Sequence, residues 1–123
     1  MPMEQRDLAA WVERYVHAWE TNDPADITAL FTPDAVYEPR PDEAAWRGHE
    51  GIVAGWLERD GQPGTWTFRS EILAVAGDLG FVRGWTRYLD DGTEYSNLWV
   101  VRLNDDGRCS SFIEWWMERK PAA

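Results

Sequence analysis

The run Gly107-Arg108-Cys109-Ser110-Ser111-Phe112-Ile113-Glu114-Trp115-Trp116-Met117-Glu118 follows the turn residues Asp105 and Asp106. Its aromatic and β-branched residues predict a β-strand, because such residues favour strands and an Asp-Asp-Gly sequence favours a turn. Both alternating sets of residues in this run are apolar, whereas a strand with one wet face alternates between apolar and polar residues. We therefore expect both faces of this strand to be covered.

One carboxylate, Glu114, lies inside this apolar run. If it faces a dry cavity, its proton affinity rises and it becomes suited to acid–base chemistry. Alternatively, it accepts a hydrogen bond from a Trp N–H group or forms a salt bridge with Arg83 or Arg87. The direction of the Glu114 side chain therefore decides most of what the sequence says about function.

The number of tryptophans is the unusual feature of the composition. The chain has 123 residues, enough for one domain with one core, and we take 1–123 as a single domain. A hydrophobic fraction of 44% is ordinary for a globular protein, but nine Trp residues exceed what a solid core of this size needs. The surplus indicates a lined cavity, a large interface, or both.

Charge and reactive residues exclude several classes of partner. Twelve basic residues against 22 acidic ones give a net charge of -10, which repels nucleic acid and anionic membranes, so we expect neither as a partner. One cysteine, Cys109, and two separated histidines, His17 and His49, favour neither a disulfide framework nor a metal site, and we expect no cofactor. Residues 1–7 do not resemble a secretion signal and the apolar runs are too short to span a bilayer, so a cytoplasmic location is expected.

Apolar periodicity predicts helices first and strands afterwards. Helices are expected over 4–20, 24–31 and about 49–59, a short strand over 35–38, and an extended piece over 46–48. Longer strands are expected over 65–75, 79–89, 94–103 and up to about 118, with turns at 60–64, 76–78, 90–92 and 104–107. This order predicts an α+β fold with helices packed on one face of a curved antiparallel sheet.

Several stretches carry a resemblance to a known superfamily. They are Val12-Glu13-Arg14-Tyr15-Val16, the run over 27–37, Trp46-Arg47-Gly48-His49-Glu50-Gly51-Ile52, Asp91-Gly92, Asp106-Gly107-Arg108 and Glu114-Trp115-Trp116. Through them the chain resembles the nuclear-transport-factor-2-like (NTF2-like) superfamily, and within it the polyketide-cyclase-like (SnoaL-like) branch, which is related in fold to ketosteroid isomerase. The resemblance covers nearly the whole chain.

The resemblance implies a cone with a cystatin-like fold, in which three N-terminal helices pack in the concave face of a strongly curved, mainly antiparallel sheet. It also implies a deep hydrophobic pocket at the open end and a homodimer that pairs through the outer face of the sheet. On the final strand, Ile113, Trp115 and Met117 would then face the partner subunit, and Phe112 and Glu114 would face the pocket.

Catalytic residues of the superfamily carry over only in part. The hydrogen-bonding Tyr of ketosteroid isomerase falls on Tyr15, but its base position falls on Pro39, next to Glu38, and its second Asp position falls on Trp99. Steroid isomerisation by that mechanism is therefore not expected. The Asp–Arg–Asp arrangement of limonene epoxide hydrolase and the paired His of scytalone dehydratase are not matched either.

The register implied by the resemblance gives a set of candidate site residues. The expected catalytic residues are Glu114, Tyr15 and Asn97, and the expected ligand contacts are Trp19, Tyr37, Trp56, Tyr95, Trp99, Phe112, Trp116 and His49. This mostly aromatic set suits a planar, hydrophobic molecule with a carbonyl or hydroxyl group to orient. For three of these residues a structural role stays open: Tyr15 as a core tyrosine, Asn97 as a buried amide, and His49 as a helix-terminal or surface residue.

Three functional hypotheses follow from this set. The first is a cofactor-independent cyclase, isomerase, dehydratase or hydrolase in which Glu114 moves the proton and Tyr15, Tyr37 or Asn97 holds the oxygen that gains charge. The second is a ligand-binding protein without catalysis. The third is a dimeric accessory module whose outer sheet face, with Trp115 and Trp85, binds another protein.

Overall fold

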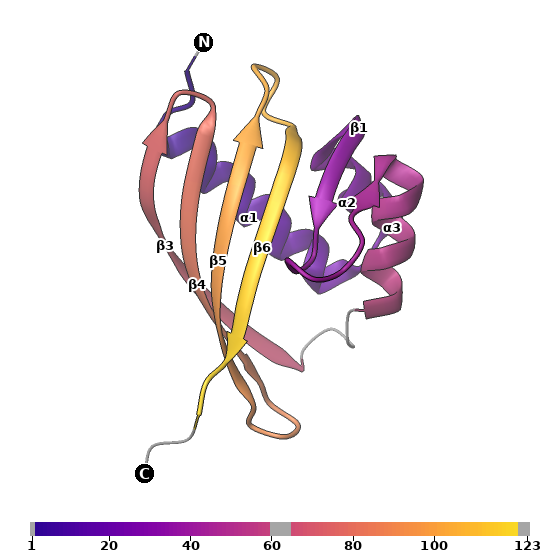
Figure 1. Cartoon of the computed structure of the whole chain (residues 1–123), viewed down its shortest axis with the longest axis vertical. Coiled ribbons are helices and arrows are strands. Elements are labelled where there is room, and N and C mark those ends of the chain that lie inside the picture. Colours follow the sequence, from indigo (N-terminus) through magenta and orange to yellow (C-terminus); the bar gives the residue numbers. More distant parts are fainter. Residues whose placement is uncertain (1, 60–64, 121–123) are drawn as a thin grey trace.

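The computed structural model of the chain describes residues 2–59 and 65–120, so the turn expected at 60–64 lies outside the described residues. The elements are α1 (Gln5–Thr21), α2 (Pro24–Ala29), β1 (Phe31–Glu38), β2 (Trp46–Arg47), α3 (Gly48–Arg59), β3 (Trp66–Ala76), β4 (Leu79–Tyr88), β5 (Glu94–Leu103) and β6 (Cys109–Glu118). The sheet order is β2-β1-β6-β5-β4-β3, and α1 crosses behind the sheet in Figure 1. All strand pairs are antiparallel except β1 with β6, so the predicted α+β class and mainly antiparallel sheet are confirmed.

Helix α1 supplies one wall of the core. Its buried residues recur at three- and four-residue steps, which places them on one face of a helix: Leu8, Trp11, Val12, Tyr15, Ala18 and Trp19. The helix ends at Asn22, whose left-handed φ of 51° lets its backbone N–H bond to the Ala18 carbonyl oxygen at 2.7 Å. The Asn22 side chain then accepts a hydrogen bond from Trp56 Nε1 at 3.0 Å, which ties α1 to α3.

The second helix is shorter than the periodicity predicted. Asp23 caps it by accepting a hydrogen bond from the Ala25 backbone N–H at 2.9 Å, and Pro24 occupies the first turn as expected. However, α2 ends at Ala29, and Phe31 already belongs to β1. The predicted helix over 24–31 was wrong at its end, because Leu30 and Phe31 join the sheet: the Leu30 carbonyl oxygen accepts from the Cys109 N–H at 2.8 Å.

The four long strands have one face toward the helices and one face away from them. Register pairs place Val82, Trp99 and Glu114 side by side, and Gly84, Asn97 and Trp116 in the next row. Val82, Trp99 and Asn97 are buried, which identifies this as the inner face. The predicted inward direction of Glu114 and Trp116 therefore agrees with the register of the sheet.

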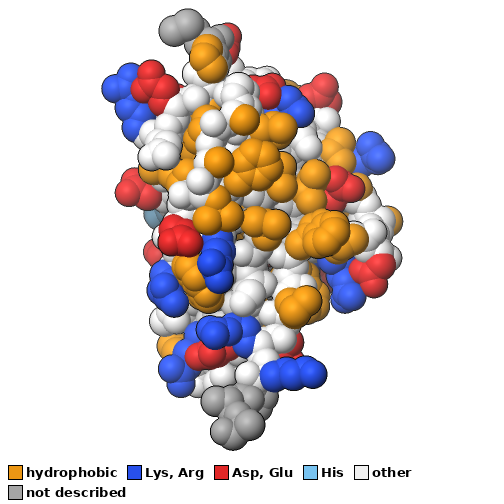
Figure 2. All heavy atoms as spheres, turned by 60° about the vertical axis from the view of Figure 1, so that its left-hand side comes forward, with side chains coloured by type: hydrophobic (Ala, Val, Ile, Leu, Met, Phe, Trp, Pro, Cys, Tyr) orange, Lys and Arg blue, Asp and Glu red, His pale blue; other side chains and the backbone are white. Residues whose placement is uncertain are grey.

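The outer sheet face carries exposed hydrophobic side chains. Trp115 is 57% exposed, Met117 73% and Leu98 39%, and Leu98 pairs directly with Trp115 across β5 and β6. Figure 2 shows hydrophobic side chains gathered on this side of the molecule, with charged groups around them.

Cys109 occupies a position that simple alternation predicted incorrectly. Alternation along β6 placed it outward, but it is fully buried. The register between β5 and β6 shifts between Arg102 and Leu103, so Arg102 pairs with Ser111 while Leu103 pairs with Cys109. The extra residue forms a β-bulge, and a bulge reverses the face of everything beyond it.

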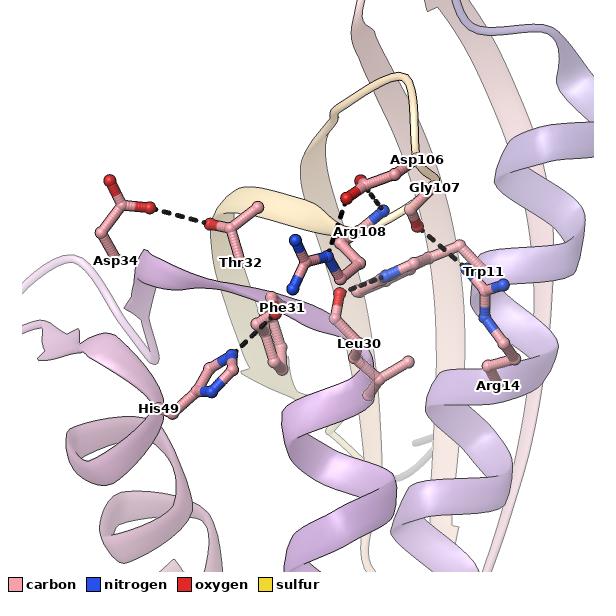
Figure 3. Close-up of polar contacts among 10 residues, drawn as sticks. All are labelled: Trp11, Arg14, Leu30, Phe31, Thr32, Asp34, His49, Asp106, Gly107 and Arg108. Carbon is pink, nitrogen blue, oxygen red and sulfur yellow. Dashed lines mark hydrogen bonds and ion pairs between the residues drawn. The ribbon is translucent and has the colours of Figure 1, made fainter.

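The end of the molecule near the β5–β6 turn is tied together by side chains that bind backbone carbonyl groups (Figure 3). Trp11 Nε1 donates to the Leu30 oxygen at 3.0 Å, and Arg14 donates to the Gly107 oxygen at 2.9 Å. His49 Nε2 lies 2.8 Å from the Phe31 oxygen. We call this region the closed end. Over the described ranges, no helix is long and apolar enough to cross a membrane.

Candidate functional site

A cavity of about 260 Å³ opens at the opposite end of the sheet, between α1, the end of α3 and the inner face of the strands. We call this region the open end. Its lining is mainly aromatic with a few polar side chains: Tyr15, Trp19, Tyr37, Trp46, Arg59, Thr86, Tyr88, Tyr95, Asn97, Trp99, Glu114 and Trp116. The cavity therefore combines a large apolar wall with a small polar centre, as ligand sites do.

The polar centre is the carboxyl group of Glu114. Its Oε2 accepts hydrogen bonds from Asn97 Nδ2 at 2.9 Å and from Trp99 Nε1 at 3.1 Å. Both donors come from β5, in which Trp99 lies directly opposite Glu114 and Asn97 lies one inner row further along. Two fixed donors from a neighbouring strand hold the carboxyl group in one orientation.

Asn97 itself is held from the next strand. The Thr86 hydroxyl on β4 donates to Asn97 Oδ1 at 2.8 Å, which fixes the direction of the amide and turns its N–H toward Glu114. Thr86 and Asn97 are both buried. The order Thr86, Asn97, Glu114 is thus a chain of hydrogen bonds that runs across three strands on the inner face, and it satisfies a buried amide that would otherwise be costly.

A pair of tyrosine hydroxyls connects to the same carboxyl group through Tyr37. Tyr15 on α1 and Tyr37 on β1 share a hydrogen bond of 2.6 Å between their hydroxyl oxygens. The Tyr37 hydroxyl also hydrogen-bonds the Glu114 side chain. Both rings are buried, so the hydroxyl pair is set by packing of the two elements.

The aromatic wall depends on a residue without a side chain. Phe68 on β3 stacks on Trp99 with ring centroids 5.1 Å apart and 15° between the planes. A Cβ atom on Gly84 would lie 2.6 Å from the Phe68 ring, which is too close for any other residue type without movement of that ring. Gly84 therefore lets Phe68 lie across the sheet and support Trp99, the donor to Glu114.

Burial raises the pKa of the Glu114 carboxyl above its usual value of 4.5. Four groups act in the opposite direction: the Trp99 N–H first, then the positive charge of Arg59, then the hydrogen bonds from Asn97 and Tyr37. Because desolvation disfavours the charged form more than these groups favour it, Glu114 keeps its proton to a higher pH than an exposed Glu does. A carboxyl group of this kind is suited to both giving and taking a proton.

Eight of the predicted site residues come together in the cavity, and three do not. Trp56 and Phe112 pack against Tyr15 beneath the cavity, with ring centroids 4.8 and 5.5 Å from it, and both are almost fully buried. They support the wall without lining it. His49 lies at the closed end with its ring nitrogen on the Phe31 carbonyl oxygen (Figure 3), so the structure does not place it near Glu114.

Four lining residues escaped the sequence prediction: Trp46, Arg59, Thr86 and Tyr88. Thr86 and Tyr88 alternate with Val82 on the inner face of β4, so the period of two in that strand contained the signal. Arg59 follows Ile52 and Trp56 at helical spacing, and that stripe also pointed toward the core. Trp46 lies in a two-residue strand, which is too short to show a pattern.

The remaining reactive groups lie elsewhere. Burial raises the pKa of the Cys109 thiol to about 12, and the thiol donates to the Ser111 carbonyl oxygen at 3.1 Å. His17 is an exposed residue of α1, with its ring nitrogen 3.6 Å from Asp26. Within the ranges 2–59 and 65–120, no three His, Cys, Asp or Glu side chains are grouped so that they could hold a metal ion.

Comparison with solved structures shows the same fold in several bacterial proteins. An NTF2-like protein of unknown function from Burkholderia xenovorans superposes with a TM-score of 0.76 at 14% identity, covering 98% of this chain and 91% of that one. An NTF2-like protein of unknown function from Mesorhizobium loti gives 0.67 at 24% identity, with coverages of 95% and 97%. A ketosteroid isomerase-like protein from Erwinia carotovora gives 0.64 at 19% identity, with coverages of 92% and 94%.

Sequence comparison identifies the family. No functionally curated protein matches this sequence. The sequence pattern of the SnoaL-like domain matches residues 12–112, which include helix α1 from Val12 onward, the first five strands and the start of β6. Together with the cone-type fold and the NTF2-like structural neighbours, this match shows that the chain belongs to the SnoaL-like domain family.

Proposed function

We propose that the chain is a cofactor-independent enzyme that moves a proton on a small hydrophobic molecule, with Glu114 as the acid–base group. The observation that carries this proposal is the Glu114 carboxyl group, which is held by Asn97 and Trp99 at the polar centre of an aromatic cavity. Membership of the SnoaL-like family supports a small-molecule-binding or isomerase-type domain.

The chemistry that suits this arrangement is proton transfer next to a carbonyl group. The Glu114 carboxylate takes a proton from a carbon beside the carbonyl, and the C–H electron pair moves into the carbon framework to give an enolate oxygen. Before the step, the Tyr37 hydroxyl donates to the Glu114 carboxylate and the Tyr15 hydroxyl bonds to Tyr37. Once Glu114 has taken the proton, the Tyr37 hydroxyl turns to donate to the enolate oxygen instead. Return of the proton from Glu114 to another carbon completes an isomerisation, and loss of a leaving group gives an elimination.

Asn97 acts as a positioning residue in this proposal. Its N–H is used by Glu114 and its oxygen by Thr86, so the amide already has a partner on each side. The prediction that Asn97 contacts the ligand directly is therefore less well supported than a role in orienting Glu114.

Exchange of carbon-bound hydrogen for deuterium tests the proposal without knowledge of the natural substrate. We expect the protein to accelerate exchange at the carbon next to the carbonyl in 1-tetralone and related aryl ketones, followed by NMR in deuterated buffer. Glu114→Gln keeps the shape of the side chain but removes the base, so exchange should fall by roughly 100-fold or more. Glu38→Gln is the matched control, because Glu38 is exposed at the end of β1, next to Pro39.

Two results would contradict the proposal. Equal exchange rates for the wild type and Glu114→Gln would remove Glu114 from the acid–base role. Saturable binding of these ketones with no exchange above buffer would favour a ligand-binding protein without catalysis. One observation favours that second function: Glu114 already receives hydrogen bonds from Asn97, Trp99 and Tyr37, an arrangement that also suits a purely structural carboxyl group.

The outer sheet face supports a further part of the proposal, namely a homodimer. Trp115 and Leu98 are exposed side by side, and Met117 lies next to them on β6. A two-fold dimer would cover these side chains with the same side chains of a second copy. Trp115→Glu should then convert the dimer to a monomer in sedimentation velocity. A variant that sediments like a dimeric wild type would count against this interface. A wild type that is already monomeric would count against any homodimer.

A further inference from the structure

In the acid–base proposal Arg59 contributes only its positive charge, which acts against the effect of burial on the pKa of Glu114. Arg59 lies in the last turn of α3 and lines both the cavity and the shallow depression outside it, so it stands at the mouth. Among the described lining residues it is the only basic one, and Glu114 is the only acidic one. Arg59 is exposed whereas Glu114 is half-buried, so a ligand entering the cavity passes the guanidinium group first.

A comparison with Arg40 shows what is particular about Arg59. The two guanidinium groups lie over the ring of Trp116, at 4.9 Å for Arg40 and 5.5 Å for Arg59. Arg40 is neutralised by ion pairs with Asp42 and Glu43. Arg59, in contrast, has no carboxylate within 4.0 Å in the described part of the chain, and its hydrogen bond goes to the Pro39 carbonyl oxygen at 3.3 Å.

The chemistry of a guanidinium group in this setting favours an acidic ligand. Arg presents several N–H donors in a fixed plane that matches a carboxylate, and one hydrogen bond leaves most of them available. Contact with the Trp116 ring and the hydrogen bond to the Pro39 carbonyl oxygen limit the positions of the guanidinium group, which lowers the entropic cost of binding. In a chain with a net charge of -10, an acid would be repelled from most of the surface, so a local positive charge is needed where it enters.

We propose that Arg59 binds an acidic group of the ligand at the cavity mouth, so that the natural ligand is an aromatic or cyclic carboxylate. This inference rests on the proposed function, because it names the class of ligand for the same cavity. The carboxylate pairs with the guanidinium group, the ring system lies among the aromatic side chains, and the carbonyl or hydroxyl end faces Glu114 and the tyrosine hydroxyls.

A matched pair of probes separates this inference from the proposed function. 2-Naphthoate and 2-acetylnaphthalene have nearly the same shape, but only the first carries a carboxylate at neutral pH. Calorimetric titration of the wild type should give tighter binding of 2-naphthoate, by about tenfold or more, because a charge-assisted hydrogen bond is stronger than a neutral one.

Variants of the two arginines decide whether Arg59 causes the preference. Arg59→Gln should lose the preference for the acid while still binding 2-acetylnaphthalene, and Arg59→Lys should keep part of it, since it retains the charge without the planar fork. Arg40→Gln, at the other arginine over the same tryptophan, should keep the full preference, because Arg40 is already paired with Asp42 and Glu43. The ratio of the two affinities does not depend on protein stability, so a purely structural role of Arg59 at the end of α3 would leave it unchanged.

Each outcome has a separate meaning. Equal binding of the two probes to the wild type, or a preference that survives Arg59→Gln, overturns the role of Arg59 and leaves the aromatic cavity as a ligand site. Absence of binding for both probes overturns this inference together with the proposed function. Loss of the preference in Arg40→Gln alone would transfer the role to Arg40 and overturn the assignment to Arg59.

Discussion

The closed end and the open end of the molecule both use tryptophan and polar side chains, but they connect them differently. At the closed end, Trp11, Arg14 and His49 each bond to a backbone carbonyl oxygen (Figure 3). At the open end, Thr86, Asn97, Trp99 and Glu114 bond to one another through their side chains. Among hydrogen bonds that involve side chains, most go to the backbone and only a minority join two side chains.

This difference separates groups that hold the fold from groups that are prepared for a ligand. At the closed end, each of these side chains supplies a donor that a backbone carbonyl oxygen needs, so its role is to hold the fold together. A network of side chains around a cavity adds little that a hydrophobic core would not supply, and it costs free energy if any member is left unpaired. We therefore interpret the open end as the functional end. Three predictions test this interpretation, from the largest expected effect to the smallest.

Trp11 and Trp116 are the first pair to compare. Trp11 is fully buried against Tyr15 and Phe31, so Trp11→Ala should lower the free energy of unfolding by about 3–5 kcal/mol. Trp116 is half-buried at the cavity mouth, so Trp116→Ala should cost only ~1 kcal/mol. Urea denaturation followed by circular dichroism measures both values. Similar losses for the two variants would contradict the division into structural and functional ends.

The pH dependence of stability tests the state of Glu114. Because its pKa is raised in the folded protein, the folded state binds more protons than the unfolded state at pH values above 4.5 and below the raised pKa. The free energy of unfolding of the wild type should therefore fall, relative to Glu114→Gln, as the pH rises through this window. Each unit by which folding raises the pKa of Glu114 should lower the free energy of unfolding by about 1.4 kcal/mol over this pH window.

Thermal or urea unfolding of the two proteins between pH 4 and pH 8 gives this difference directly, since all other titrating groups are shared. A difference that stays constant with pH would show an ordinary pKa for Glu114. A difference that changes in the other direction would show that the hydrogen bonds from Trp99 and Asn97 outweigh burial.

His49 gives the smallest expected effect and tests the closed end. His49→Ala removes one hydrogen bond to the Phe31 carbonyl oxygen, which should cost about 1 kcal/mol of stability. Because His49 does not line the cavity, the affinity for 2-acetylnaphthalene should stay within a factor of about two of the wild type, which is the ordinary scatter of a neutral change. A larger change in affinity would place His49 in the functional end after all.

The sequence predicted the part of the site that follows strand alternation. The register implied by the family resemblance, carried along each strand by its period of two, placed Glu114, Asn97 and Trp99 on the inward set, and the structure has them on one face. Alternation failed at Cys109, because a bulge adds a residue that leaves no trace in the hydrophobic pattern. It also could not tell a wall residue from a supporting one, so Phe112 and Trp56 were predicted as ligand contacts although they lie one layer below.

The hydrophobic pattern of the sequence could not predict which side chains hydrogen-bond to Glu114. The sequence allowed Glu114 to pair with Arg83, Arg87 or a Trp N–H group, and the structure selects Trp99 together with Asn97. Arg83 lies on the outer face, opposite Leu98, and so cannot reach Glu114. The donor that reaches Glu114 is decided by strand register, and register is set by long-range pairing rather than by local residue preferences.

The parallel pairing of β1 with β6 has a consequence for how the site is made. The strand that carries Glu114 is synthesised after the other five strands of the sheet, yet it lies between β1 and β5. Tyr37 and Asn97, which both contact Glu114, belong to these two flanking strands and are separated from it by 77 and 17 positions along the chain. No direct pairing joins β1 to β5, so the same strand that connects the two parts of the sheet also brings the carboxyl group to Tyr37 and Asn97.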